Sequence, residues 1–325
     1  MMLKTLLLTT LSLSPLIAAE KSNNATWTVF EKALKEDPDF SIQGEYFKEG
    51  SAYGIQVVAL GDGKFDAYIL EGGLPGLGWT KDKSRVKLSG QREGELVTFA
   101  RNGDFNLIIT GQTAKLSGKD VAELPRIARQ SPTLGAKAPE GASVLFDGTS
   151  TDGWTNAKME NGLLLSTGTT SKETFKDYSL HLEFLTPYKP HARGQGRGNS
   201  GVYFGGRWET QVLDSFGLDG LMNEAGGIYS IAAPSVNMCL PPLTWQTYDV
   251  DFTDAKFDAD DKRTAWPRMT VKLNGVLIHD NQELGKDLTT AAPMEGPLKD
   301  EGRPVFLQNH SNPVFFRNIW VLPKK

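Results

Sequence analysis

Hydrophobic and polar residues alternate along several stretches of the second half of the chain. The stretch from Tyr178 to Phe184 has an apolar residue at every second position, and Tyr248 to Phe252 and Met269 to Leu273 repeat the pattern. A period of two puts one set of side chains on one face of a strand. Asn274-Gly275 favours a type I′ hairpin turn after the third stretch. The pattern predicts two packed antiparallel sheets with the following residues buried between them: Tyr178, Leu180, Leu182, Phe184, Val250, Phe252, Val271 and Leu273.

The first half of the chain also shows a strand pattern. One short helix is expected before Pro38, and strands follow from Gln43 to Leu116. Two of them, Ile55 to Leu60 and Phe65 to Leu70, flank a glycine turn. We therefore predict an all-β protein, in which a smaller, mostly β domain (residues 20–118) precedes a jelly-roll β-sandwich.

A change in composition marks the boundary between the two halves. From Gly118 to Gly141 the chain is polar and contains three prolines. We predict a linker over residues 119–142 and a second domain over residues 143–325. Because proline and small residues dominate from Ala136 to Pro139, few contacts should tie this part of the linker to either domain.

The first 19 residues have the features of a secretory signal peptide. An early lysine precedes an apolar run from Leu6 to Ile17, and two small residues, Ala18-Ala19, come before Glu20. Cleavage after Ala19 would export the protein to the periplasm or the extracellular space. No cysteine follows that site to carry a lipid, and no later segment is suited to span a membrane.

Charge and cysteine content narrow the set of partners. The formal net charge is −4, which gives no electrostatic reason to expect a nucleic acid. Cys239 is the only cysteine, so an exported chain would fold without an internal disulfide. The oligomeric state is left open.

The stretch Trp208 to Leu213, followed by Asp214, carries the strongest candidate chemistry. Glu209 and Gln211 point to the same side of a strand, while Asp214 points to the other unless a β-bulge shifts the register. With that bulge, two carboxylates and an amide would line one wall of a cleft and could transfer protons to and from a sugar. Crowding should also raise the pKa of one carboxyl group. The simpler alternative is that Glu209 and Gln211 only face water.

The glycine-rich loop from Arg193 to Gly201 resembles a phosphate-binding loop only superficially. A strand follows it where such loops need a helix, so the dinucleotide reading fails. A flexible loop at a sheet edge is the default interpretation. Alternatively, Arg193 and Arg197 could close over an anionic or polar ligand. The Asn199 part of the loop is expected within reach of the face that carries Glu209.

Three further residues are candidates for the same site. His310 lies in a polar cluster between two apolar strands, where a hairpin turn is the simpler explanation. Tyr229 and Trp245 could stack on a sugar ring, although base rates favour a place in the core. If Asp214 proves to lie on the opposite face, Glu209 and His310 become the next catalytic pair to test.

Six short motifs occur in an order that resembles a known family. The sequence is similar to the 3-keto-disaccharide hydrolase domain family from about Val144 to Pro323. The motifs are Leu145-Phe146-Asp147-Gly148, Asp152-Gly153-Trp154, Asn199-Ser200-Gly201-Val202-Tyr203-Phe204, Glu209-Thr210-Gln211-Val212-Leu213-Asp214, Trp245-Gln246-Thr247-Tyr248 and Phe315-Phe316-Arg317-Asn318-Ile319. The resemblance implies a concanavalin-like jelly roll that acts on glycosides whose glucose carbon 3 is a ketone. It also implies export, and it leaves the role of the first domain open.

The resemblance also suggests a mechanism. A ketone at carbon 3 acidifies the hydrogen on carbon 2, so a base and an acid can cleave the glycosidic bond by elimination, followed by hydration. Glu209 and Asp214 would be that pair, and His310 or a bound divalent cation would polarise the ketone. The proposed substrate-binding residues are Gln211, Asn199, Tyr229, Trp245 and Arg193. The sequence requires no cofactor, and the metal requirement is left open.

Three alternatives are left open: a conventional glycosidase, a binding module from another functional class, and a structural exported domain without a ligand. The offsets of Glu209, Gln211 and Asp214 match the Glu-x-Asp-x-x-Glu motif of laminarinase-like glycosidases, which would make the chain a conventional hydrolase of β-glucans. Here the middle acid is an amide and the last acid is shorter, so the match is incomplete. A jelly roll can equally serve as a non-catalytic carbohydrate-binding module.

Overall fold

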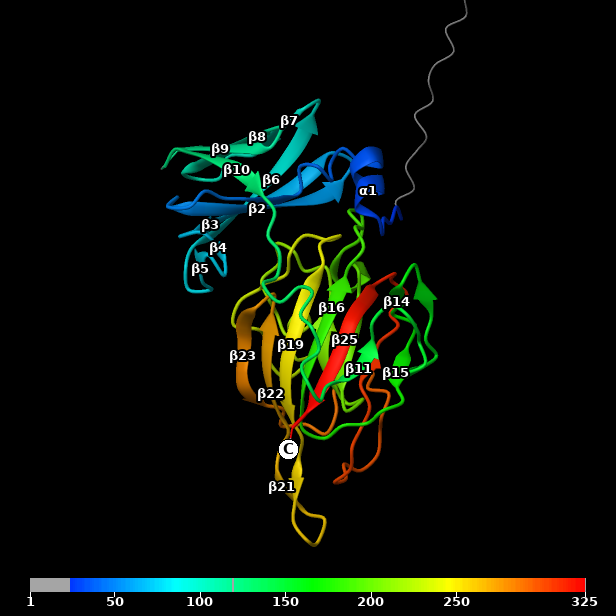
Figure 1. The fold of residues 1–325 in the computed structure, drawn as a ribbon. Coiled ribbons are helices and arrows are strands. Elements are labelled where there is room, and N and C mark those ends of the chain that lie inside the picture. Colours follow the sequence, from blue (N-terminus) through cyan, green and yellow to red (C-terminus); the bar gives the residue numbers. More distant parts are fainter. Residues whose placement is uncertain (1–23, 119, 325) are drawn as a thin grey trace, which may run out of the picture.

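The computed structural model describes residues 24–118 and 120–324. The predicted signal peptide, residues 1–19, lies outside the described residues. Two β domains are stacked end to end, with a barrel at the top and a sandwich below in Figure 1. Among the described residues, no helix has the length and apolar character needed to cross a membrane.

The first domain is a closed antiparallel barrel that follows a short helix, α1 (Phe30–Glu36). The strand order around the barrel is β1-β10-β9-β8-β7-β6-β3-β2, and pairing between β1 and β2 closes the ring. The strands are β1 (Gly44–Tyr46), β2 (Tyr53–Gly61), β3 (Lys64–Glu71), β6 (Arg85–Glu93), β7 (Leu96–Phe99), β8 (Phe105–Thr110), β9 (Thr113–Gly118) and β10 (Ala122–Ile127), with a small parallel pair, β4 (Leu74–Pro75) and β5 (Gly78–Trp79), beside them.

The second domain is a sandwich of two antiparallel sheets. The larger sheet has the order β13-β14-β25-β16-β19-β22-β23, and β11 also pairs with β25. Its strands are β11 (Ser143–Phe146), β13 (Met159–Glu160), β14 (Leu163–Leu165), β16 (Tyr178–Leu185), β19 (Gln246–Thr253), β22 (Arg268–Leu273), β23 (Val276–Glu283) and β25 (Phe315–Pro323). The smaller sheet has the order β12-β15-β24-β17-β18, with β12 (Trp154–Thr155), β15 (Thr169–Ser171), β24 (Phe306–Leu307), β17 (Ser200–Phe204) and β18 (Trp208–Val212). A hairpin of β20 (Lys256–Phe257) and β21 (Arg263–Ala265) extends from the end away from the barrel (Figure 1).

The predicted all-β fold and its predicted core are confirmed. All eight residues named from the alternation are buried, the most exposed of them, Val250, at only 2%. Asn274 and Gly275 both adopt positive φ in a two-residue loop between β22 and β23, as a type I′ turn requires. Alternation succeeds here because a one-residue slip would turn every apolar side chain toward water.

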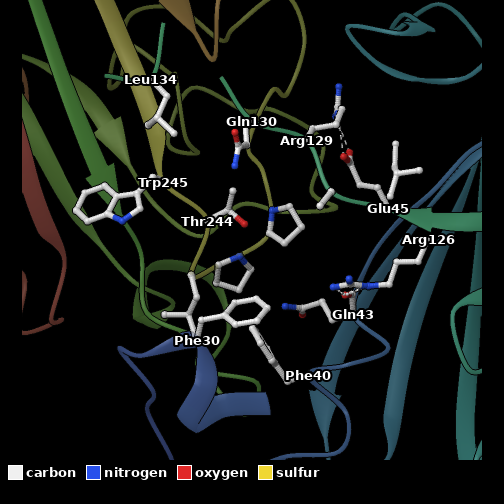
Figure 2. Close-up of a pocket in the computed structure, with 15 residues that line it drawn as sticks. Phe30, Phe40, Gln43, Glu45, Arg126, Arg129, Gln130, Leu134, Thr244 and Trp245 are labelled. Carbon is white, nitrogen blue, oxygen red and sulfur yellow. Dashed lines mark hydrogen bonds and ion pairs between the residues drawn. The ribbon is translucent and has the colours of Figure 1, made fainter. Parts of the chain in front are cut away.

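Hydrogen bonds between backbones, and from side chains to backbone, connect the two domains. The backbones of Trp27 and Tyr188 exchange two hydrogen bonds. From the barrel, the Lys81 ammonium donates to the carbonyls of Gly220 and Pro234, both at 2.7 Å. Arg85 donates to the carbonyl of Gly217 at 2.6 Å, so barrel residues contact the loop between β18 and β19 at three points. Residues of both domains also line a cavity between them (Figure 2).

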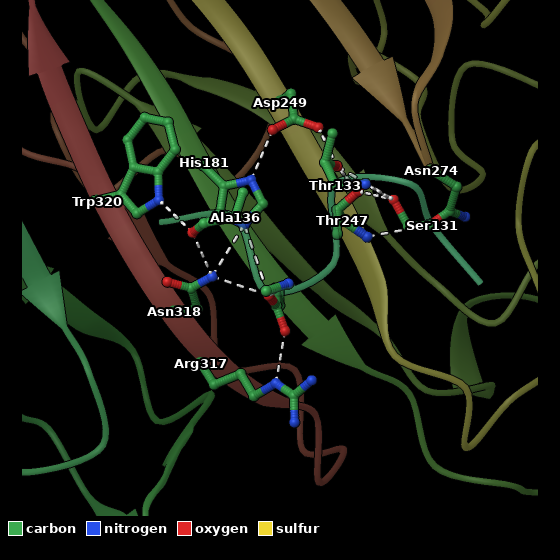
Figure 3. Close-up of polar contacts among 12 residues, drawn as sticks. Ser131, Thr133, Ala136, His181, Thr247, Asp249, Asn274, Arg317, Asn318 and Trp320 are labelled. Atoms are coloured by element: carbon green, nitrogen blue, oxygen red, sulfur yellow. Dashed lines mark hydrogen bonds and ion pairs between the residues drawn. The ribbon is translucent and has the colours of Figure 1, made fainter. Parts of the chain in front are cut away.

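The connection between the domains is held more tightly than its composition suggested. Its first part is β10, the strand that completes the barrel, so the barrel extends into the segment assigned to the linker. Farther on, the segment 131–136, which we call the strap, crosses the outer face of the larger sheet (Figure 3). Thr133 donates to Asp249 at 2.6 Å, and the Ala136 carbonyl accepts from Asn318 and Trp320. The expectation of few contacts is therefore wrong at Ala136, because its backbone pairs with polar side chains on the sheet.

Candidate functional site

A tight hairpin places Glu209 and Gln211 on the outer face of the smaller sheet. Gly205 and Gly206, both with positive φ, turn the chain between β17 and β18. The even-numbered residues of β18 face the sandwich core, where Trp208 and Val212 join the apolar cluster. The odd-numbered residues therefore point to the other side of the sheet.

A small polar cavity of about 100 Å³ lies on that outer face. The hairpin forms its floor, and the segments around Gln195, Tyr229, Thr290 and His310 form its walls. The lining residues are Gln195, Asn199, Glu209, Gln211, Tyr229, Thr290, Ala291, Gln308 and His310. Five of the nine were predicted as site residues from the sequence: Asn199, Glu209, Gln211, Tyr229 and His310.

Glu209 is the one carboxylate among these lining residues. The residue is only 3% exposed, and burial raises the pKa of its carboxyl group to about 7. The Tyr203 hydroxyl, which donates to Glu209 Oε2 at 2.9 Å, opposes this rise. Gln308 Nε2 donates to the same hydroxyl at 3.0 Å and holds it in place. The sequence predicted a raised pKa from a second carboxylate, but its main cause is desolvation.

Amide side chains supply most of the remaining polar groups in the cavity. Gln195 Oε1 accepts hydrogen bonds from Gln211 Nε2 at 2.8 Å and from Asn199 Nδ2 at 2.9 Å. The side-chain carbonyl oxygens of Asn199, Gln211 and Gln308 are buried and have no hydrogen-bond partner. Leaving such acceptors unpaired costs free energy, so the cavity favours a ligand that carries several hydroxyl donors.

Asp214 lies apart from the cavity. The pairing of β17 and β18 runs in uninterrupted register from Phe204↔Trp208 to Ser200↔Val212, so the paired part of the hairpin contains no bulge. Beyond its end, Asp214 is fully buried and its Oδ2 accepts from Arg197 Nε at 2.7 Å. The structure thus pairs this carboxylate with an arginine and does not bring it to Glu209.

Two other predicted site residues also lie elsewhere. Trp245 lines the cavity between the domains, as Figure 2 shows. Arg193 is exposed, and it donates to the carbonyls of Pro190, Ala192 and, in the barrel, Leu60. Neither residue lines the cavity around Glu209.

The sequence analysis missed four lining residues, Gln195, Thr290, Ala291 and Gln308, and also Tyr203, which donates to Glu209. For Tyr203 a signal existed, because the Gly205-Gly206 turn joins two strands of equal length. Pairing across that turn puts Tyr203 directly opposite Glu209. Gln195, Gln308 and Thr290 come from segments with no such local relation to β18.

Within residues 24–118 and 120–324, no group of three or more histidine, cysteine, aspartate or glutamate side chains is placed to hold a metal ion. The oxygen atoms in the cavity belong to Glu209 and to neutral amides and hydroxyls. Hydrogen bonding to a neutral, hydroxyl-rich molecule is the chemistry that these groups suit best.

The fold and the cavity define a glycosyl hydrolase-like β-sandwich. The chain belongs to the family described as the 3-keto-alpha-glucoside-1,2-lyase-like domain, whose match spans residues 141–322. A solved candidate glycosyl hydrolase from Parabacteroides distasonis is 29% identical, with a TM-score of 0.52 over 57% of this chain and 85% of that chain. A second one from the same organism is 19% identical, with a TM-score of 0.42 over 57% and 95%. The search of curated proteins gave no match.

Proposed function

We propose that this protein cleaves glycosides whose glucose unit carries a ketone at carbon 3, by elimination across carbons 1 and 2. The family description, which names a 3-keto-α-glucoside 1,2-lyase, supports this substrate class. The observation that carries the proposal is Glu209, a buried carboxyl group with a pKa of about 7 in a cavity lined by amides. At neutral pH such a group is about half ionised and can accept a proton efficiently.

The chemistry needs one base and one proton donor. The ketone at carbon 3 acidifies the hydrogen on carbon 2, and the Glu209 carboxylate takes that proton. The electron pair of the C2–H bond forms a double bond between carbons 1 and 2 while the C1–O bond breaks. The leaving oxygen then takes from the Glu209 carboxyl group the proton that Glu209 accepted from carbon 2, which restores the carboxylate. The products are an unsaturated keto sugar and an alcohol, and later addition of water to the double bond gives net hydrolysis.

The other cavity residues have roles in binding and polarisation. The unpaired carbonyl oxygens of Asn199, Gln211 and Gln308 would accept hydrogen bonds from sugar hydroxyls. His310 or Tyr229 would donate to the ketone oxygen and stabilise the negative charge that develops there. A positioned acid or base of this kind typically contributes ~10²–10⁴-fold to the rate.

Conventional glycoside hydrolysis receives less support from this geometry. A retaining glycosidase uses two carboxyl groups about 5–5.5 Å apart, and an inverting one uses two that are farther apart. Here Glu209 is the one carboxylate among the lining residues. Asp214 does not line the cavity and is paired with Arg197. Elimination needs only one carboxylate base, so it fits this cavity better.

The test is to incubate the purified protein with p-nitrophenyl 3-keto-β-glucoside and its 3-keto-α anomer, and with the unoxidised glucosides. We expect p-nitrophenol and an enone absorbance from at least one oxidised substrate only. Glu209→Gln should lower turnover ~10²–10⁴-fold. The matched control Glu160→Gln, at an exposed residue of the same domain, should leave it unchanged. Cleavage of the unoxidised glucosides at similar rates would refute the substrate class, and saturable binding without any product would make the chain a binding module.

We also propose that the protein is exported, since residues 1–19 have the pattern of a signal peptide. Expression of the full chain in a bacterial host, followed by mass spectrometry of the periplasmic fraction, should give a protein that begins at Glu20. Recovery of the intact chain from the cytoplasm alone would contradict export.

A further inference from the structure

The cavity between the barrel and the sandwich is separate from the proposed active site. Its volume is about 280 Å³, and both domains contribute to its lining. Phe40 and Gln43 come from the first domain, and Pro241, Thr244 and Trp245 come from the second (Figure 2). None of these residues lines the cavity around Glu209.

Gln43 offers a buried hydrogen-bond donor to this cavity. The residue is 1% exposed, and its Oε1 accepts from the backbone N–H of Ala59 at 3.0 Å. That bond fixes the orientation of the amide, because only its oxygen can accept from an N–H group. Nε2 is left with no partner, and Figure 2 shows the amide end of Gln43 directed toward the cavity. A ligand oxygen placed there would satisfy this donor.

Aromatic side chains form apolar walls around that donor. Phe30 and Phe40 lie at one end of the cavity, and Trp245 lies at the other (Figure 2). The Trp245 ring is held in place, because the Arg317 guanidinium lies over it, 4.0 Å from its centroid. Arg317 in turn donates to Glu183 at 2.6 Å. A rigid aromatic ring loses little conformational entropy when a ligand packs on it.

The charged groups of this cavity are already engaged within the protein. Glu45 accepts two hydrogen bonds from Arg129, both at 2.6 Å. Arg126 donates twice to the backbone carbonyl of Gln43, at 2.7 and 3.0 Å. An ionic ligand would have to compete with these contacts, so the cavity favours a neutral ligand that combines apolar surface with oxygen atoms.

We propose that this interdomain cavity is a second carbohydrate-binding site, which takes a neutral pyranoside. The C–H face of the sugar packs on Trp245 or the phenylalanine rings, and one of its oxygen atoms accepts from Gln43 Nε2. Ligand pockets typically measure roughly 300–1,000 Å³, so a cavity of about 280 Å³ suits a small ligand such as a single sugar ring. The proposal does not depend on the reaction at Glu209.

The test uses isothermal titration calorimetry on the mature chain with Gln211→Ala, which weakens the other cavity. The ligands are methyl β-D-glucopyranoside and cellobiose, with glucuronate as the charged comparison. We expect a neutral sugar to bind at one site, and Trp245→Ala to weaken that binding at least tenfold. Trp266→Ala is the matched control, because Trp266 also has an arginine over its ring, Arg263, but lies outside the cavity.

A second variant guards against a simple loss of folding. Thr244→Phe fills the cavity without removing a wall, and it should abolish the same binding while circular dichroism and the melting temperature stay near those of the parent. Binding that survives both cavity variants, tighter binding of glucuronate, or no binding of either neutral sugar would overturn the proposal. Turnover is not measured in this test, so its outcome is independent of the proposed reaction.

Discussion

Glu209 and Glu183 are both buried on strands of the sandwich, yet their environments differ sharply. Glu209 lies on the outer face of the smaller sheet and receives one hydrogen bond, from Tyr203. Glu183 lies on the outer face of the larger sheet and contacts the strap. It accepts from the Gly135 backbone N–H at 2.6 Å, Arg317 at 2.6 Å and Asn318 at 2.9 Å.

The difference shows that the number of donors, and not burial alone, decides what a buried carboxylate can do. Burial tends to raise the pKa of both groups. At Glu183, contacts with His181, Asn318, Gly135 and Arg317 outweigh that effect and hold the pKa at about 2. At Glu209, the single donor does not, and the pKa is raised to about 7. Glu183 is therefore a permanently charged anchor, whereas Glu209 can exchange a proton near neutral pH.

The largest expected effect is on the pH dependence of stability. The folded pKa of Glu209, about 7, is above its unfolded value of 4.5, so the folded state holds this proton more tightly. Its contribution is most favourable below pH 4.5 and is lost as pH rises to about 7, a change on the order of 3 kcal/mol. Glu209→Gln should remove this loss. Urea unfolding of both proteins between pH 4.5 and 7.5 measures it, and parallel stability curves would show that the carboxyl group is not perturbed.

A second effect of similar size should follow from crowding Glu209. A methyl group added at Gly201 would lie 2.1 Å from Glu209 Oε1, so Gly201→Ala must displace the carboxylate. A displacement of about 1 Å can lower turnover about 10²-fold. Gly196→Ala is the matched control, because nothing lies within 4 Å of the added atom. The measurement is kcat/KM on the 3-keto substrate. Equal activity of the two variants would contradict the proposed role of Glu209 as the base.

The smallest effect should come from Glu183. Glu183→Gln leaves Arg317 without its charged partner and should lower the free energy of unfolding at pH 7 by about 1–3 kcal/mol. Because the folded pKa of Glu183 is lowered, its contribution is complete above pH 4.5 and is lost as pH falls toward about 2. The difference from the wild type should therefore shrink over that range in urea unfolding. The kcat of Glu183→Gln should stay within twofold of the wild-type value. A large loss of turnover would contradict the assignment of Glu183 to a structural role.

The sequence predicted the sheets well but the cavity only in part. Regular alternation identified the strands that contain Leu180, Val250 and Val271, because burial on one side leaves no other register. The same rule placed Glu209 and Gln211 on one face. It could not show that Asp214 pairs with Arg197, since that contact depends on how the loop before β17 packs against the end of β18.

Long-range packing also explains the residues that were missed. Gln308, the residue directly after β24, reaches the cavity from about a hundred positions along the chain from Glu209. Thr290 comes from a segment without regular structure, where no periodicity exists to be recognised. The contacts of the strap were missed for a related reason. A proline-rich composition indicates an extended backbone but says nothing about the polar side chains that such a backbone meets, here Asn318 and Asp249.

The anchoring of one sandwich loop by the barrel has a consequence for the evolution of this chain. The loop held by Lys81 and Arg85 also carries Tyr229, a wall of the cavity, and the Asn223 carbonyl that accepts from Gln211. Recombination that replaced the barrel with an unrelated module would release this wall unless the new module supplied cations at the same points. In this chain the barrel therefore supports the cavity indirectly, and substitutions at Lys81 or Arg85 would change the cavity without altering a residue that lines it.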